Sequence, residues 1–161
     1  VFLTLIYLYF LNICGKMFLG DSGAYLLGLS FSILLIFRYE TYQDFSPFFI
    51  VLLLWMPCFE NLFSIIRKSL HKLSPASPDN NHFHQLVFFF FKKKLKLKSN
   101  LTNNLSSLII IFYNLIIFYF GSLDIYNTKY QIFLIIVNIL NYLIVYNFLF
   151  KYKNKDQLFD L

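Results

Sequence analysis

Long apolar runs, separated by short polar connections, dominate the sequence. Asp, Glu, Lys and Arg are absent from four of these runs, which are 1–15, 22–37, 101–121 and 130–150, and a fifth run, 46–66, contains only Glu60. A helix needs about 17–25 apolar residues to cross a bilayer. The pattern therefore predicts an all-α, polytopic membrane helix bundle with about five transmembrane helices, the first of them short.

Two of these runs depart from plain lipid-facing helices. The second has 16 uncharged residues, which at about 1.5 Å each fall short of a hydrocarbon core of about 30 Å. We expect this span to cover about 18–37, which draws Asp21 to the membrane interface. In the third run Pro57 predicts a kink, because proline removes a backbone hydrogen bond. Glu60 beyond it must face protein, water or a cation.

Composition supports the same class of protein. The chain is 58% hydrophobic and 14% charged, which leaves too little charge to cover a soluble domain, so we expect a single integral membrane domain over 1–161. Val1 already lies in an apolar run with no basic stretch before it, which argues against a signal peptide and favours the C-terminal part of a longer protein. Cys14 and Cys58 lie in apolar runs and are interpreted as small packing residues.

Basic residues are distributed unevenly between the connections. Only Arg38 and Lys129 fall in the second and fourth connections, whereas twelve others share the opposite side: Lys16, Arg67, Lys68, Lys72, Lys92, Lys93, Lys94, Lys96, Lys98, Lys151, Lys153 and Lys155. The positive-inside rule makes that side, with the loop 67–98, cytoplasmic. The net charge of +6 is then explained by topology, and no nucleic-acid partner is expected.

Asp21 lies beside glycines at the start of the second span, in GKMFLGDSGAY. It is interpreted in two compatible ways. As a helix N-cap it would satisfy free backbone N–H groups and suit the helix dipole. As a metal ligand it would suit Mg²⁺, while the glycines let a phosphate approach the helix N-terminus.

The predicted cytoplasmic loop contains SPASPDNNHFHQL, with Asp79, His82 and His84 close together. Zinc is disfavoured because further ligands would be needed and no Cys is near. Two interpretations remain open. The segment is a polar loop with incidental histidines, or the imidazoles donate hydrogen bonds to phosphate oxygens.

Two further features stand near this loop. Glu60, Ser64 and Arg67 share one helical face, where Glu60 and Arg67 could simply neutralise each other. The stretch LVFFFFKKKLKLK, 86–98, is interpreted as a loop returning to the membrane interface, with Phe buried and Lys among anionic head groups.

Three segments in this order carry a resemblance to a known family: KMFLGDSGAYLLG (16–28), PCFENLFSIIRK (57–68) and SPASPDNNHFHQL (74–86). The chain resembles the polyprenyl-phosphate N-acetylhexosamine-1-phosphate transferases, a group of glycosyltransferase family 4 that includes undecaprenyl-phosphate GlcNAc-1-phosphate transferases. The likeness covers nearly the whole chain but only the C-terminal half of the family's larger bundle. Where relatives have a second adjacent histidine, this chain has Gln85, which cannot carry a proton or charge.

The resemblance implies roles for individual residues. Asp21 corresponds to the family's catalytic, Mg²⁺-binding aspartate, with Mn²⁺ as a substitute metal. His82 and His84 correspond to the catalytic histidine element that contacts the nucleotide-sugar phosphates. Substrate-binding roles are implied for four other residues, which are Phe18, beside the uracil ring, Gly20, beside the diphosphate, Arg67 and Asp79. The family's paired aspartates and its Asn- and Asp-bearing loop precede Val1, so residues 1–161 alone are expected to be inactive.

The implied reaction transfers a HexNAc-1-phosphate from a UDP-N-acetylhexosamine to polyprenyl phosphate and releases UMP. It would begin the synthesis of a cell-surface glycan, such as O-antigen or teichoic acid, on the cytoplasmic face of a bacterial inner membrane. Membrane lipids are further expected partners, and a homodimer is compatible with the chain. Phospho-MurNAc-pentapeptide transferase is the alternative enzyme. A non-catalytic membrane remnant or transporter half is the alternative of another class, although a transporter more naturally places polar groups near the midplane.

Overall fold

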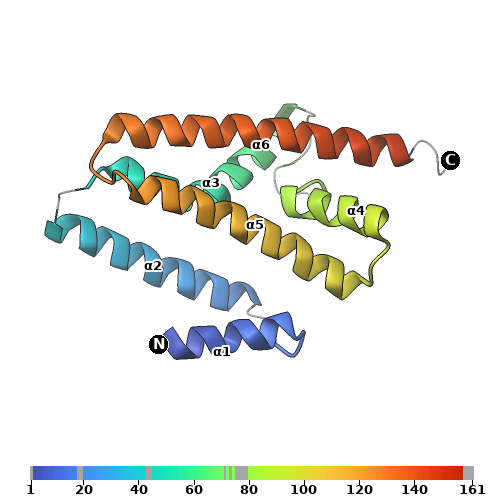
Figure 1. The fold of residues 1–161 in the computed structure, drawn as a ribbon, viewed down its shortest axis with the longest axis horizontal. Helices are drawn as coiled ribbons and strands as arrows, with labels where there is room; N and C mark the ends of the chain where they lie inside the picture. Colours follow the sequence, from blue (N-terminus) through green and yellow to red (C-terminus); the bar gives the residue numbers. More distant parts are fainter. Residues whose placement is uncertain are drawn as a thin grey trace. The chain divides into compact units, whose positions relative to one another are not determined.

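The computed structural model describes residues 2–17, 20–42, 45–70, 72, 74 and 80–157, and every regular element within them is a helix (Figure 1). The helices are α1 (Phe2–Ile13), α2 (Gly20–Tyr42), α3 (Pro47–Leu70), α4 (Phe83–Leu95), α5 (Ser99–Ser122) and α6 (Thr128–Gln157). They form two compact units, Val1–Phe45 and Ser46–Leu161. The predicted all-α membrane helix bundle is confirmed.

Three helices of the described part are long and apolar enough to cross a membrane, at Pro47–Leu70, Ser99–Ser122 and Thr128–Lys155. They match the third, fourth and fifth predicted spans and extend each by a few residues. α1 is a shorter apolar helix. α2 runs past the predicted 18–37 to Tyr42 and includes Arg38 and Glu40. Membrane crossing by α1 and α2 stays a prediction.

The first unit places Asp21 inside a helix. α2 begins at Gly20, whose φ of +66° lies in the left-handed region that only glycine adopts without strain. The backbone of Asp21 is the second residue of the helix. The N-cap interpretation is therefore corrected to a first-turn position, where the helix dipole still favours a negative charge.

The predicted loop 67–98 contains a helix that the sequence analysis did not anticipate. α4 follows His82, whose backbone N–H donates to the side-chain oxygen of Gln85 at 3.2 Å. It ends where the backbone N–H of Lys96 donates to the carbonyl of Lys92 at 3.1 Å, with Lys96 at φ +52°. Lysines in the last turn suit the negative end of the helix dipole. The helix thus has a defined start and end, and α4 lies beside α5 and α6 (Figure 1).

Aromatic rings fill the interior of the second unit. Tyr142 packs against Phe83 with centroids 4.9 Å apart and against Phe59 at 5.1 Å. Tyr146 packs edge-on against Phe63 at 4.7 Å. Lipid tails are as apolar as these side chains, so van der Waals packing and interhelical hydrogen bonds, rather than exclusion from water, hold the helices together.

Polar groups tie the helices at the end of the unit where α5 turns into α6. The backbone N–H of Ser46 donates to the carbonyl of Ile125 at 2.9 Å. The Gln131 amide is fully buried and donates to the carbonyls of Gly121 and Asp124, each at 2.8 Å. Leu52 also packs closely against Gly121, because a Cβ at position 121 would lie 2.5 Å from Cδ2 of Leu52.

We predict that Gly121→Ala destabilises the protein. The new methyl group collides with Leu52, which is fully buried, and overpacking of this kind typically costs about 1–3 kcal/mol. Gly28→Ala is the matched control, because a Cβ at Gly28 meets nothing within 4 Å. Thermal unfolding in detergent checks the prediction, and equal midpoints for the two variants would contradict it.

Candidate functional site

Among the described residues of the second unit, Glu60 is an acidic group with several hydrogen-bond donors. Its Oε1 accepts hydrogen bonds from the backbone N–H of Phe83 at 2.7 Å and from Nδ1 of His82 at 3.1 Å. Its Oε2 accepts from the Tyr142 hydroxyl at 2.5 Å. An acid close to the hydrocarbon region needs such donors. These contacts join α3, the start of α4 and α6 through one carboxylate, which goes beyond the neutralisation by Arg67 considered from sequence.

Arg67 lies on α3 near the segment that leads into α4. Its Nη1 donates to the backbone carbonyl of Asn81 at 2.7 Å and also to the Tyr146 hydroxyl. That hydroxyl in turn donates to the Asn81 carbonyl at 3.0 Å. From α6, Nζ of Lys153 donates to the carbonyl of Asn80 and to the Asn81 side chain, both at 2.8 Å. Two cations and a phenol thus anchor the segment directly before His82.

His82 and His84 are stacked at the start of α4, with ring centroids 5.8 Å apart and planes within 15°. A carboxylate can only accept, so an ionised Glu60 requires the proton on Nδ1 of His82, and Nε2 is then the ring nitrogen left for other partners. The His84 side chain is exposed overall, yet partial burial lowers its pKa below the ordinary value of 6.5. The nearby Glu60 charge raises that pKa and His82 lowers it, both to a smaller extent.

The structure brings together only some of the residues singled out from sequence. Arg67, His82 and His84 lie in one cluster of the second unit. Gly20 lies at the start of α2 in the first unit, and Asp21 follows it, with a side chain outside the described part. Phe18 and Asp79 lie outside the described residues. The substrate-binding and catalytic roles of all seven residues stay predictions.

A magnesium site cannot be assembled from the described residues. No group of three or more His, Cys, Asp or Glu side chains capable of holding a metal occurs among them. The carboxylate oxygens of Glu60 already accept hydrogen bonds from His82, Phe83 and Tyr142. The Mg²⁺ expectation therefore rests on the sequence interpretation of Asp21 and on the resemblance.

Three polar residues of α6 were not predicted from sequence to be partners of the cluster, although they hold it. They are Tyr142, Tyr146 and Lys153, which lie on one helical face at i, i+4 and i+11. A tyrosine pair at this spacing, ending in a lysine, was the available signal. This spacing did not stand out, because aromatic residues are common along this helix, as elsewhere in the chain.

The described residues thus form a membrane helix bundle in which a histidine pair at the start of α4 adjoins Glu60 of α3. The chain is similar to a probable undecaprenyl-phosphate N-acetylglucosaminyl 1-phosphate transferase of Bacillus subtilis (strain 168), with 40% identity over 70 residues, which is 43% of this chain and 20% of the relative. It is also similar to the undecaprenyl-phosphate alpha-N-acetylglucosaminyl 1-phosphate transferase of Thermotoga maritima, with 35% identity over 71 residues, 44% of this chain and 23% of the relative.

These similarities confirm the resemblance recognised in the sequence. The matched segment covers about a fifth of the length of each relative. No family model matches the chain, and no solved structure matches it.

We predict that Glu60→Gln lowers the pKa of His84 further. The Glu60 charge raises that pKa, so its removal acts in the same direction as burial. Histidine ring resonances followed against pH by NMR provide the measurement, with Glu40→Gln in α2 as the control. A pKa that is unchanged or higher in Glu60→Gln would contradict the electrostatic assignment.

In the unaltered protein the folded state binds fewer protons at His84 than the unfolded state does, because the pKa of His84 is lowered on folding. His84 therefore contributes a loss of stability as the pH falls below 6.5.

Tyr142→Phe tests the third donor to Glu60. The variant keeps the ring that packs against Phe83 but removes the hydroxyl. Since hydrogen bonds to charged groups typically contribute about 1.5–3 kcal/mol, we expect a loss of this order in the free energy of unfolding in detergent. The control variant Tyr126→Phe, at an exposed ring, should leave the free energy of unfolding nearly unchanged. Similar losses in both variants would contradict the role of the Tyr142 hydroxyl as a donor to Glu60.

Proposed function

We propose that the protein containing this chain transfers a HexNAc-1-phosphate from a UDP-sugar to undecaprenyl phosphate or a related polyprenyl phosphate, with release of UMP. The observation that carries the proposal is the similarity to two transferases named for this chemistry. The anchored histidine pair at the start of α4 supports it. The stage of cell-surface glycan synthesis, the cytoplasmic face and the bacterial inner membrane are parts of the same proposal.

The reaction forms one bond and breaks another at phosphorus. An oxygen of the lipid phosphate attacks the β-phosphorus of the sugar nucleotide, and the bond to the oxygen of the α-phosphate breaks so that UMP leaves with the electron pair. Both reactants are anionic, so positioning and neutralisation of charge are the main tasks. No general base is needed, because the attacking oxygen is already deprotonated.

The histidine cluster suits the task of binding phosphate oxygens. Tyr142 and the Phe83 N–H hold Glu60, which in turn binds the ring of His82. Little conformational freedom is therefore lost when a ligand binds to this ring. In its neutral state His84 can donate one N–H, and its lowered pKa favours that state near neutral pH. We propose that both rings bind the nucleotide-sugar phosphates.

Asp21 is proposed as one carboxylate ligand of Mg²⁺, or of Mn²⁺ in its place. A carboxylate in the first turn of a helix next to a left-handed glycine suits a hard cation with an anionic ligand. Bound Mg²⁺ would supply charge neutralisation at the diphosphate. Because the described residues do not complete such a site, we further propose that residues 1–161 alone are inactive.

The test measures UMP release from UDP-GlcNAc by the full-length protein with undecaprenyl phosphate and Mg²⁺. We expect Asp21→Asn to reduce turnover by about 10³-fold or more, the scale reached when a preorganised electrostatic group is lost, and to leave the thermal unfolding midpoint intact. Asp124→Asn, in the turn after α5, is the matched control and should retain activity. Unchanged turnover in Asp21→Asn would refute the metal-ligand role, and no UMP from the unaltered protein would refute the function.

A further inference from the structure

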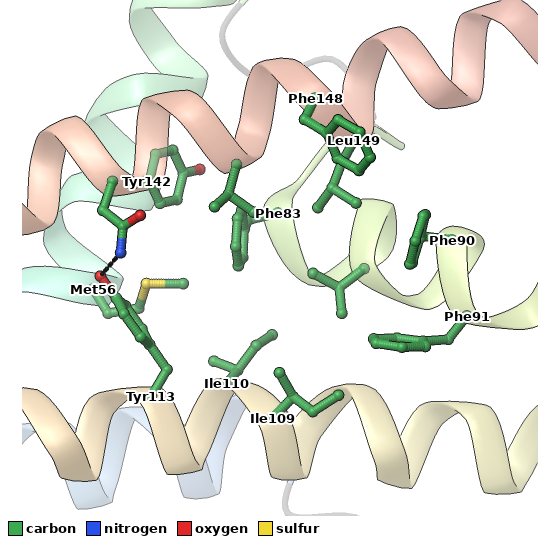
Figure 2. Close-up of a pocket in the computed structure, with 13 residues that line it drawn as sticks. Met56, Phe83, Phe90, Phe91, Ile109, Ile110, Tyr113, Tyr142, Phe148 and Leu149 are labelled. Atoms are coloured by element: carbon green, nitrogen blue, oxygen red, sulfur yellow. Dashed lines mark hydrogen bonds between the residues drawn. The ribbon is translucent and has the colours of Figure 1, made fainter. Parts of the chain in front are cut away.

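The second unit encloses an apolar cavity of about 360 Å³ between α3, α4, α5 and α6 (Figure 2). Phe90 and Phe91 lie at one end of it, and Met56 and Tyr113 lie at the other (Figure 2). Its few polar lining groups are already engaged, since Asn141 donates to the Tyr113 hydroxyl at 3.2 Å and the Tyr142 hydroxyl donates to Glu60. The cavity therefore offers hydrocarbon contacts to a ligand.

The cavity is accessible from the surface that would face the bilayer. Ile109 of α5 and Phe148 of α6 both line it, and both are exposed. Ile109 lies ten residues after Ser99, where α5 begins, which corresponds to about 15 Å along the helix. That depth is half of a hydrocarbon core of about 30 Å. The apolar lining therefore suits an acyl chain that enters between α5 and α6.

Positive charge adjoins the end of the cavity formed by α4. Nζ of Lys94 lies 5.3 Å from the ring centroid of Phe90, which lines the cavity. Lys96 and Lys98 follow and are exposed like Lys94, and the sequence from 80 to 123 contains no Asp or Glu. Lysines at a membrane surface attract anionic head groups. The apolar cavity and this cluster, Lys94, Lys96 and Lys98, thus complement the two parts of an anionic lipid.

We propose that the cavity and the lysine cluster together form a binding site for an anionic glycerophospholipid. One acyl chain occupies the cavity, and the head-group phosphate pairs with the lysines. The head-group part of the site lies apart from the histidine cluster, because Lys94 is twelve positions from His82 along α4, a separation of about 18 Å. A polyprenyl phosphate bound for reaction would instead place its phosphate at the histidines.

The test uses native mass spectrometry of the full-length protein in neutral detergent, with dioleoyl phosphatidylglycerol and dioleoyl phosphatidylcholine as competing probes. We expect one phosphatidylglycerol to be retained in preference to phosphatidylcholine. The variant Lys94→Gln/Lys96→Gln/Lys98→Gln should weaken this retention by about fivefold per lysine, on the order of 100-fold in all. Its control, Lys129→Gln at the start of α6, removes a lysine beside the turn that joins α5 to α6 and should change retention by less than about twofold.

A second pair of variants tests the cavity. Val145 lines it, whereas its neighbour Ile144 is exposed and does not. Val145→Phe should therefore displace the acyl chain and lower phosphatidylglycerol retention about tenfold, an effect of the size of losing two buried methylene groups, while Ile144→Phe should not. A circular-dichroism melt establishes that each variant is folded.

Three results would overturn the proposal. Equal retention of phosphatidylcholine would show a cavity without head-group selection, and an equal loss in the control lysine variant would show a general surface effect. Retention of undecaprenyl phosphate in place of phosphatidylglycerol at these lysines would assign the site to the reacting lipid. Because retention is measured without turnover, these results are independent of whether UMP is released.

Discussion

The carboxylate of Glu60, whose side chain is only 16% exposed, is the constraint on which the second unit depends. An ionised group removed from water loses hydration that only hydrogen-bond donors can replace. Here the donors are His82 and the Phe83 N–H at the start of α4, together with Tyr142 of α6. Satisfying the charge therefore requires three helices to meet at one point. The same contacts set the orientation of His82.

Other hydrogen bonds extend the contact between α3, α4 and α6. Arg67, Tyr146 and Lys153 bind the backbone or side chains of Asn80 and Asn81, directly before the histidines. The four residues from Asn80 to Phe83 are consequently held from both α3 and α6. The segment that leads into α4 is in this way tied to two helices by hydrogen bonds, which suits a site that must position charged phosphates.

Two environments of opposite chemistry share the side chains of Phe83 and Tyr142. On one side Tyr142 donates to Glu60 in the polar cluster, and on the other both rings line the apolar cavity (Figure 2). This arrangement suits a protein whose ligands combine a hydrocarbon chain with a phosphate. The similarity to undecaprenyl-phosphate sugar transferases extends over 43–44% of the chain, and the anchored histidine pair gives that similarity a structural counterpart.

The sequence alone determined the class of the fold and the order of the helices other than α4, because apolar runs of this length must satisfy their backbone groups internally. It also marked Arg67, His82 and His84, through residue types and motif order. It missed α4 as a helix, and it missed Tyr142, Tyr146 and Lys153 as partners of the site.

Those features were decided by tertiary structure. In a membrane helix apolar and aromatic residues face both lipid and protein, so periodicity does not reveal which side packs inward. The contact between Tyr142 and Glu60 joins positions 82 residues apart, and no local pattern contains it. A charged residue within an apolar run predicts that hydrogen-bond partners exist, but only the folded chain determines which residues they are.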